Sequence, residues 1–453
     1  MHQLHWYGLT VGTLLAAKLL LSIRRRRPAA TEWETSGSAG RTVHAVITAC
    51  NEAPEMLTRC LESLLEQTQR PQSVTVIDDA SRDIDAAAAV IRQLRADFDH
   101  AGIELRFIRF PENRGKRHGL AAGFQQHPDA DLYLCVDSDT VLAETAVAEL
   151  CAPFVRRRIN CVTGLVLAHN RSVNLLTRLI DMRYVNAFLG ERVAYGRLGS
   201  VLCACGSLVV YRGRVVRQHL DDFLNQRFLG KPATFGDDRR LTYYCLKEGQ
   251  SVIQPTAIGY TDVPQTLGHY SRQQVRWGKS FIREGFILLV KVHHMARAFW
   301  WLNLIEVGTW LAFTTGLLTA LTLTILHPGG WPLMASYAAF VCVMAWIRSL
   351  HYLRGAANVP ARDRYLTYLA APLYALLNLF LLLPLRLYSL ATLRKNDWGT
   401  RQNVEIPSDE TTPATATVPM PVAALDDDTL RIPLVKLYDP DSETTLQTVL
   451  PAR

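Results

Sequence analysis

The sequence predicts an α/β domain with a mostly parallel sheet, joined to helices that lie on or in a membrane. Between residues 43 and 167, short apolar segments alternate with amphipathic segments of helical length. This alternation is typical of a mostly parallel sheet with helices on both faces. Near both ends of the chain, long segments are almost free of charge, and about 20 apolar residues are enough to cross a bilayer. These observations exclude a simple soluble enzyme and a pure membrane bundle.

The first apolar segment, 4–23, predicts an uncleaved membrane anchor. A run of arginines at 24–27 follows the apolar core instead of preceding it, unlike the charge order of a cleaved signal peptide. Positive charge collects on the cytoplasmic side of membrane segments. We therefore expect an anchor over 1–27 with its N-terminus outside, a polar linker over 28–42 and a cytosolic globular domain over 43–266.

The globular domain is expected to alternate strands with helices. The strands are predicted at 43–49, 73–78, 104–109, 131–136 and 160–167. The helices are predicted at 55–67, 83–97, 116–126 and 144–155. Because ligands bind at the carboxyl ends of the strands in such sheets, the residues that follow each strand are the candidate site.

The second part of the chain predicts membrane contact. Residues 267–297 mix charges with aromatic side chains, which indicates an interfacial helix. The block 298–391 contains apolar stretches and is expected to be transmembrane. Its segment 365–385 is interrupted by prolines and has arginines on both sides. Positive charge at both ends indicates that both ends lie in the cytoplasm, so we expect the segment to be re-entrant. The alternative is that the N-terminus does not lie outside the cell. The tail, 392–453, has few aromatic residues and is expected to be a largely disordered cytosolic segment.

Charge and cysteine content narrow the class of protein further. The chain of 453 residues has a formal net charge of +8, which is compatible with nucleic-acid binding. The basic residues, however, flank the apolar segments, so we expect a lipid bilayer and no nucleic acid as partner. The nine cysteines include no CxxC pair and are expected to be free thiols in a reducing compartment.

Acidic residues follow two of the predicted strands. Asp78 and Asp79 come at the end of the second strand, and Asp137 and Asp139 follow the fourth. Two carboxylates one residue apart suit a divalent cation and its phosphate ligand, because hard cations prefer oxygen. Asp-rich turns also cap helices, so it is the recurrence at two strand ends that predicts a site.

Basic and aromatic motifs complete the pattern. Lys116 and Arg117 open a predicted helix, where cationic side chains and free N–H groups suit a diphosphate. No GxxxxGK[ST] loop is present, which argues against a P-loop nucleotidase. Farther along, Gly-Asp-Asp at 236–238 precedes Gln-x-x-Arg-Trp at 273–277. Trp277 by itself also fits a membrane-interface anchor.

In this order the motifs resemble those of the processive family 2 glycosyltransferases, which include cellulose, chitin and hyaluronan synthases. The likeness to hyaluronan synthases rests on the segments 115–118, 136–140, 175–188, 228–238, 261–264 and 276–284. Nodulation-type chitin-oligosaccharide synthases share most of these motifs. The resemblance covers roughly residues 43–401 and implies a cytosolic GT-A-type domain in a multi-pass protein of the plasma membrane.

The resemblance also implies an activity. It indicates an inverting β-glycosyltransferase that polymerises UDP-GlcNAc and UDP-GlcA into hyaluronan and exports the growing polysaccharide. The alternatives are a chitin-type synthase that uses UDP-GlcNAc alone, a single-sugar transferase acting on a lipid, and an inactive membrane scaffold. A scaffold need not keep Asp139, Asp238, Arg276 and Trp277 together, so their presence argues against it.

Roles for single residues follow from the same resemblance. Asp238 is expected to be the general base, and Asp137 and Asp139 are expected to bind Mg²⁺ or Mn²⁺. The expected nucleotide-sugar ligands are Asp78, Asp79, Lys116, Arg117, Asp137 and Arg276, and the expected acceptor ligands are Gly206, Ser207, Gln273 and Trp277.

The chain departs from the family pattern at a few positions. Ala80 stands where the family usually has Gly, Cys50 where it has Tyr, and Ser207 where it has Pro. We expect these changes to adjust the fit of nucleotide or acceptor. Hyaluronan synthases generally have two N-terminal membrane helices where this sequence predicts one, which puts the lateral wall of any translocation channel in question.

Glu306 is the only ionisable residue in the stretch 298–326. A carboxylate inside a membrane segment is costly against lipid and usually faces a polar cavity or a partner. Glu306 is therefore expected either to lie at the level of the lipid headgroups or to line the path of the sugar chain beyond Trp277. In the second case, a nearby cation such as Arg283 would have to offset its repulsion of glucuronate.

Overall fold

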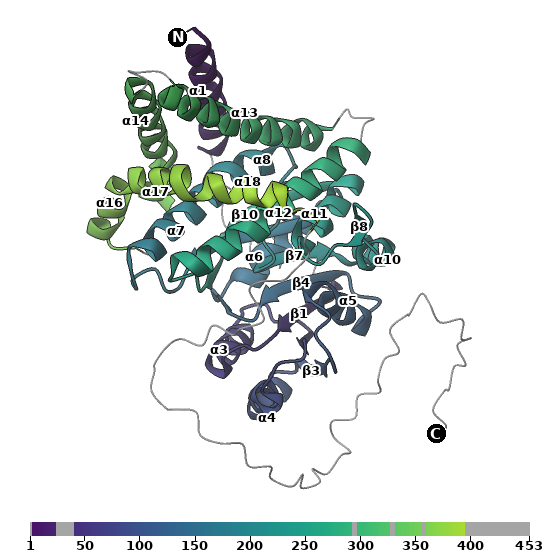
Figure 1. Cartoon of the computed structure of the whole chain (residues 1–453). Helices are drawn as coiled ribbons and strands as arrows, with labels where there is room; N and C mark the ends of the chain where they lie inside the picture. The colour runs from purple at the N-terminus through teal and green to yellow at the C-terminus, as the bar shows by residue number, and fades with distance from the viewer. Residues whose placement is uncertain (1, 24–39, 292–296, 327–330, 356–358, 395–453) are drawn as a thin grey trace, which may run out of the picture. The chain divides into compact units, whose positions relative to one another are not determined.

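The structure is a computed structural model that describes residues 2–23, 40–291, 297–326, 331–355 and 359–394 (Figure 1). The arginine run at 24–27, most of the predicted linker and nearly all of the predicted tail lie outside these ranges.

A mixed sheet of eight strands forms the centre of the globular part, in the order β3-β2-β1-β4-β7-β6-β10-β5. Its strands are β1 (Val43–Ala49), β2 (Ser73–Asp78), β3 (Glu104–Arg109), β4 (Leu132–Asp137), β5 (Thr140–Leu142), β6 (Ile159–Ala168), β7 (Leu208–Arg212) and β10 (Gln250–Thr261). Strands β3, β2, β1 and β4 run parallel, as the alternating pattern predicts. Every predicted strand is present, with ends that differ by at most one residue.

The second half of the sheet adds two reversed strands to the expected, mostly parallel arrangement. Strand β7 runs antiparallel to both β4 and β6, and β5 runs antiparallel to β10. After β6 the chain forms helical segments over residues 175–197 and stays near the carboxyl edge of the sheet. Strand β7 therefore enters the sheet from that edge, and the residues just before it lie beside the ends of the parallel strands.

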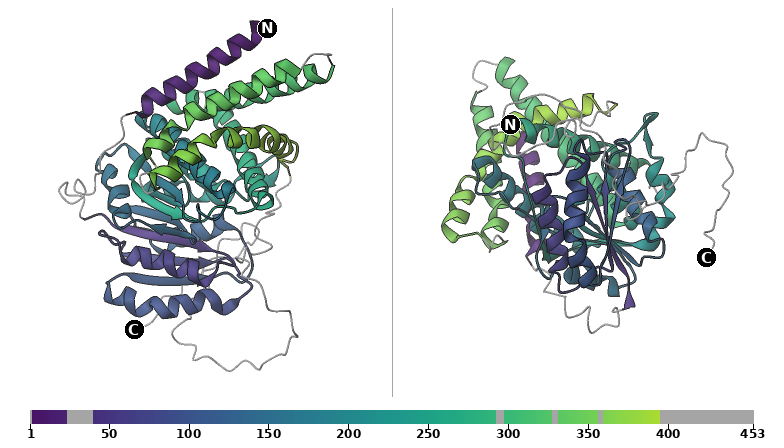
Figure 2. Two further views of the ribbon diagram at one scale, coloured as in Figure 1. Left: turned by 90° about the vertical axis from the view of Figure 1, so that its left-hand side faces the viewer. Right: turned by 90° about the horizontal axis from the view of Figure 1, so that it is seen from below.

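Helices cover both faces of this sheet (Figures 1 and 2). They are α3 (Pro54–Leu65), α4 (Ile84–His100), α5 (Lys116–Gln126), α6 (Ala146–Cys151), α7 (Leu175–Val185), the π-helix η3 (Asn186–Arg192), α8 (Val193–Arg197), α9 (Gly213–Gln218), α10 (Leu220–Leu224) and α11 (Asp237–Glu248). A short hairpin of β8 (Arg227–Phe228) and β9 (Lys231–Pro232) precedes α11. Apolar helix faces bury Leu57 and Leu61 of α3 against Ile47 and Leu134 of the strands in one continuous core.

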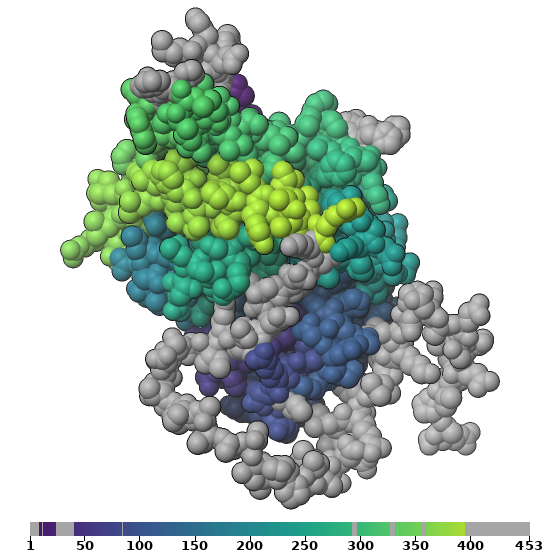
Figure 3. Space-filling model, in the orientation of Figure 1, coloured from purple at the N-terminus to yellow at the C-terminus, as the bar shows by residue number. Residues whose placement is uncertain are grey.

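The helices after the sheet pack on one another and on the segment η3–α8. They are α12 (Leu267–Lys291), α13 (Ala298–Leu326), α14 (Trp331–Arg348), α15 (Leu350–Gly355), α16 (Ala361–Leu369), α17 (Ala371–Leu377), the π-helix η4 (Asn378–Leu382) and α18 (Leu383–Ala391). The N-terminal helix α1 (His2–Ser22) contacts α8, η3 and α14. Helix α18 lies along α12, and Figure 3 shows α17 and α18 crossing the molecule between α12 and the helices α13 and α14.

Two helices in the described part of the chain are long and apolar enough to cross a membrane, Ala298–Leu326 and Ala371–Ala391. The second differs from the predicted segment 365–385. Pro372 and Pro384 do not end it, because each lies in the first turn of a helical segment, where a proline needs no N–H partner. The π-helix η4 precedes Pro384 and keeps the run continuous.

Candidate active site

Residues from four separate segments meet at the carboxyl edge of the sheet. The Ser207 hydroxyl donates to Oδ2 of Asp137 at 2.7 Å, and Lys116 pairs with Oδ1 of the same carboxylate. A Cβ added to Gly206 would lie 3.4 Å from the Lys116 ammonium and 3.8 Å from Cβ of Asp238. The expected acceptor-binding, nucleotide-binding and base residues therefore surround one small space.

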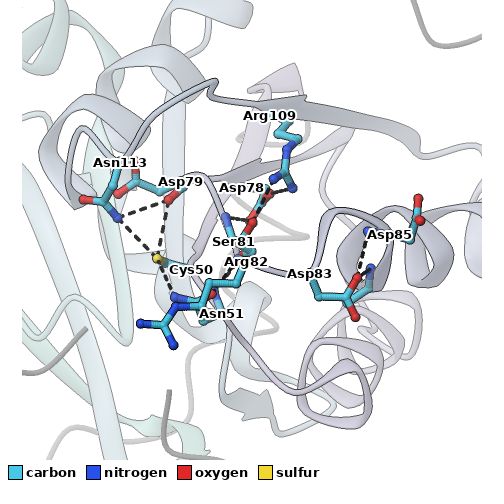
Figure 4. Close-up of polar contacts among 11 residues, drawn as sticks. Cys50, Asn51, Asp78, Asp79, Ser81, Arg82, Asp83, Asp85, Arg109 and Asn113 are labelled. Carbon is cyan, nitrogen blue, oxygen red and sulfur yellow. Dashed lines mark hydrogen bonds and ion pairs between the residues drawn. The ribbon is translucent and has the colours of Figure 1, made fainter. Parts of the chain in front are cut away.

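The expected uridine-binding acids are tied to the protein (Figure 4). Asp78 is fully buried, and its carboxylate accepts hydrogen bonds from Arg109 at 2.5 Å and from the Ser81 hydroxyl. The carboxylate of Asp79 accepts the backbone N–H groups of Arg114 at 2.7 Å and Gly115 at 2.8 Å. Both acids thus shape the loops that follow β2 and β3, and their contact with a nucleotide stays a prediction.

Arg117 lies beneath the site. Its side chain is almost fully buried, and its guanidinium pairs with Asp237 at 2.8 Å and donates to Oε1 of Gln226 at 2.6 Å. The neighbouring Lys116, by contrast, is directed to Asp137 at the sheet edge. In this position Arg117 holds the Gly-Asp-Asp segment through its ion pair with Asp237. Its predicted contact with the nucleotide stays a prediction.

A group of carboxylates follows β1 and β4. Asp139 accepts hydrogen bonds from the hydroxyls of Thr261 at 3.1 Å and Thr140 at 3.2 Å, both through Oδ1. Burial, together with the negative charges of Asp137 and Glu52, raises the pKa of Asp139 to about 7. A cation bound here would relieve this mutual repulsion.

These carboxylates suit a metal that also binds substrate. In the parts of the chain that the structure describes, no three His, Cys, Asp or Glu side chains are grouped as a metal site. Mg²⁺ commonly takes only one or two carboxylates and completes its shell with phosphate oxygens and water. Asp137 and Asp139 therefore fit such a cation. Glu52 was missed in the sequence, although its place three residues after β1 is the signal that could have found it.

The two acids of the Gly-Asp-Asp segment have different surroundings. Gly236 has φ +88° and packs against Ser280, so it provides a left-handed turn at the start of α11. Asp237 is buried by its ion pair with Arg117. Asp238 is half-buried, and its Oδ2 accepts a hydrogen bond from the Cys203 thiol at 3.4 Å. Of the two, Asp238 is the acid that a substrate can reach.

Trp277 on α12 lies at the other side of the site. Its side chain is 36% exposed, the Arg183 guanidinium lies 5.4 Å from the ring centre, and the Tyr184 ring is tilted against it at 6.3 Å. The negative charge of Asp139 also acts on the Tyr184 phenol. One turn earlier, the Gln273 side-chain oxygen is buried without a hydrogen-bond partner among the described residues.

The start of α12 is strongly cationic. Burial and the nearby charges of Arg272 and Arg276 lower the pKa of His269 to about 4. The guanidiniums of Arg272 and Arg276 make this end of the helix positively charged. Such a charge suits the diphosphate for which Arg276 is predicted.

Glu306 faces the globular part of the chain. It is half-buried on α13, and together with burial it raises the pKa of the Tyr195 phenol on α8. Glu306 is also in electrostatic contact with Arg239, the residue after Asp238. Which of the two expected positions this carboxylate takes, at the lipid headgroups or along the path of the sugar chain, stays a prediction.

Arg283 does not accompany Glu306 as expected. It is buried under α11, where it pairs with Glu284 at 3.0 Å and donates to the carbonyl of Phe235. Its helix turns it away from α13, because position 283 falls on the face of α12 that packs against α11.

The mixed sheet with acids at its carboxyl edge is the arrangement expected of a GT-A-type glycosyltransferase domain. Residues 40–280 match the family model described as "Glycosyltransferase like family 2". Since the match spans more than half of the chain, the chain belongs to that family.

Curated relatives of two kinds are similar to most of the chain. A hyaluronan synthase of Streptococcus pyogenes is 37% identical over 80% of this chain and 84% of its own length. An N-acetylglucosaminyltransferase of Mesorhizobium japonicum is 34% identical over 88% of this chain and 90% of its own length. Among solved structures, S. aureus TarS has 14% identity and a TM-score of 0.40, over 73% of this chain and 55% of that one.

Proposed function

We propose that the protein is a membrane-embedded, processive, inverting β-glycosyltransferase that makes hyaluronan from UDP-GlcNAc and UDP-GlcA and passes the chain through the membrane. The observation that carries the enzymatic part is the meeting of Asp238, Gly206 and Lys116 around one small space at the sheet edge. The similarity to a hyaluronan synthase over most of both chains supports the polymer. The similarity to an N-acetylglucosaminyltransferase supports the alternative, a chitin-type chain made from UDP-GlcNAc alone.

The chemistry is a single displacement. Trp277 stacks on the terminal acceptor sugar, and Asp238 takes the proton from its attacking hydroxyl. The hydroxyl oxygen bonds to the anomeric carbon from the face opposite UDP, while the bond from that carbon to the diphosphate oxygen breaks and UDP leaves with the electron pair. One displacement turns the α-linked donor into a β-linkage.

Cationic groups stabilise the leaving diphosphate. Arg276 on α12 and Lys116 beside Asp137 supply positive charge from the protein. Asp137 and Asp139 are the residues that would hold Mg²⁺ or Mn²⁺, which when bound neutralises charge on the departing UDP. The aspartates, in turn, are held in place by Ser207 and Thr261.

In this proposal the growing polysaccharide leaves the cell between the membrane-spanning helices of the protein. The helices Ala298–Leu326 and Ala371–Ala391 have the length and composition of spans, and α18 lies directly along α12, which carries Trp277. We place the protein in the plasma membrane as a multi-pass protein with its catalytic domain in the cytoplasm. Its partners are then UDP-sugars, the growing polysaccharide and lipid.

The experiment that tests the product supplies membranes with UDP-GlcNAc alone, with UDP-GlcA alone and with both. We expect high-molecular-weight polymer only with both, sensitive to hyaluronidase and resistant to chitinase. Polymer from UDP-GlcNAc alone would assign the chitin-type activity instead. Intact UDP binding without any transfer would favour the scaffold.

A further inference from the structure

Around Trp277 and the helices that follow the sheet, four half-buried arginines lie over aromatic rings without forming an ion pair with any carboxylate in the described ranges; Arg212 of β7, over Phe154, meets the same description elsewhere in the fold. The pairs are Arg183 over Trp277 (5.4 Å), Arg192 over Phe188 (4.1 Å), Arg239 over Phe281 (5.2 Å) and Arg386 over Phe313 (6.0 Å). We name these eight residues the arginine–aromatic cluster. The buried arginines under α11 differ, since Arg117, Arg240 and Arg283 each pair with Asp237 or Glu284.

The four guanidiniums belong to one region. Arg386 of α18 is in repulsive electrostatic contact with Arg183 of α7. Arg192 and Arg239 both act on the Cys203 thiol, which donates to the predicted base Asp238. The region therefore begins at the base and at Trp277 and reaches α13 and α18, which belong to the two candidate membrane spans.

Positive charge is in excess there. The acids that act on the four guanidiniums in this region are Glu191, Glu306, Asp238 and Glu284. Glu284 is already paired with Arg240 and Arg283. Glu191 is already paired with Arg348 at 2.6 Å. Removing a guanidinium from water without a counter-charge costs free energy, and the cost rises beside membrane helices. Such an excess is explained if an anionic ligand supplies the missing counter-charge.

We propose that the arginine–aromatic cluster binds the carboxylates of an acidic β-linked sugar chain as the chain leaves Trp277. The proposal rests on the proposed function. A guanidinium presents parallel N–H donors that match a carboxylate in two hydrogen bonds. The aromatic rings offer flat apolar surfaces to sugar rings, and stacking on them holds each guanidinium in a fixed plane. A neutral N-acetylglucosamine chain would bring no negative charge to offset the excess.

The test measures binding of two oligosaccharides to the full chain in nanodiscs of zwitterionic lipid. One is a hyaluronan octasaccharide, and the other is a neutral chitin-type oligosaccharide of similar length. In the double variant Arg183→Gln/Arg386→Gln, we expect affinity for the acidic ligand to fall about tenfold or more, the usual size of a lost charge-assisted hydrogen bond. Affinity for the neutral ligand should change less than about twofold, and the salt dependence of acidic binding should weaken.

Two further variants keep the result interpretable. Arg183→Lys/Arg386→Lys keeps the charge without the planar fork and should show an intermediate loss. Arg362→Gln removes an exposed arginine of α16 and should leave both affinities unchanged. Binding of UDP to each variant shows that its catalytic domain is folded.

Equal loss of both ligands, or no loss of the acidic one, would overturn the proposal. So would variants that retain the oligosaccharide but lose a thermal stabilisation that added phosphatidylserine gives the wild type in nanodiscs, since the cluster would then bind lipid phosphate. The polymer assay with the two UDP-sugars is read separately. Polymer from UDP-GlcNAc alone therefore overturns the proposed product and can be told apart from failure of the cluster.

Discussion

At the scale of single residues, side-chain partners separate acids that look alike in sequence. Asp237 and Asp238 are neighbours, yet Asp237 is buried against Arg117 while Asp238 accepts only a thiol and a backbone N–H near Gly206. An acid held in a buried ion pair is poorly placed to take a proton from a substrate. We therefore propose Asp238, and not Asp237, as the base.

We predict that Asp238→Asn reduces sugar transfer by about 10²–10⁴-fold, the usual effect of removing a general base. UDP binding should be nearly unchanged, because the residue faces the acceptor side beside Gly206. Polymer yield and UDP affinity, measured on the same preparation, check this. Asp221→Asn, at an exposed position of α10, is the control. Near-normal polymer yield from Asp238→Asn would remove this residue from the role of base.

We also predict that EDTA stops the reaction and that Asp139→Ala has the same effect. The carboxylates of Asp137, Asp139 and Glu52 repel one another, and a divalent cation offsets that repulsion. Activity after chelation, and after adding Mg²⁺ or Mn²⁺ back, measures the dependence. Binding of Mn²⁺ to the wild type and to Asp139→Ala, followed by electron paramagnetic resonance, gives a second readout. Full transfer in metal-free buffer would exclude a metal at this position.

At the scale of elements, helices α11 and α12 form one unit through buried charges. Glu284 of α12 accepts hydrogen bonds from Gln226 at 2.6 Å and Arg283 at 3.0 Å, and pairs with Arg240 of α11 at 3.2 Å. Helix α11 begins with the predicted base, and α12 carries Trp277. The distance between base and acceptor platform is thus set by a network beneath both.

Glu284→Gln is expected to lower the free energy of unfolding by about 3–5 kcal/mol, because it leaves buried guanidiniums without their counter-charge. Thermal unfolding of the detergent-solubilised protein measures the loss. Glu55→Gln, at an exposed position of α3, should have little effect. If both variants unfold at the wild-type temperature, the network does not hold the two helices together.

At the scale of the whole molecule, a histidine pair at the amino edge of the sheet links stability to pH. The rings of His44 and His127 stack at 3.9 Å, and both bond the Ser73 hydroxyl, at 2.7 and 2.8 Å. Burial and the facing His127 lower the pKa of His44 to about 4, and burial and Arg106 lower that of His127. Glu104 and Asp131 also face the pair and act in the opposite direction.

Protonation of these imidazoles favours the unfolded chain, because each binds a proton more tightly there than in the native state. Their contribution to stability is complete above about pH 6.5, the ordinary value for histidine. It is lost as the pH falls from there toward the lowered value of about 4. We therefore expect the unfolding temperature to fall over this interval and the fall to be smaller in His44→Asn. His100→Asn, at an exposed position, should keep the wild-type slope. Equal slopes in all three proteins would contradict this.

The sequence by itself determined the parallel half of the sheet, the acids that follow β2 and β4, and the family. Apolar periodicity and short motifs depend on residues close together in the chain, so they can be read without knowledge of long-range packing. Most of the segment predicted at 365–385 lies in a continuous helix at 371–391, because a π-helix and a first-turn position let that helix keep its prolines.

The tertiary structure decided which side chains remain available for chemistry. It turned Arg117 toward Asp237, which is 120 residues away, and it brought Ser207 to Asp137 by running β7 backwards into the sheet. It also left the guanidiniums of Arg183 and Arg386 without a carboxylate in the described ranges. The role of a charged or polar side chain depends on the partner that it contacts in the folded protein. These partners are distant in the sequence, so short sequence patterns do not predict them.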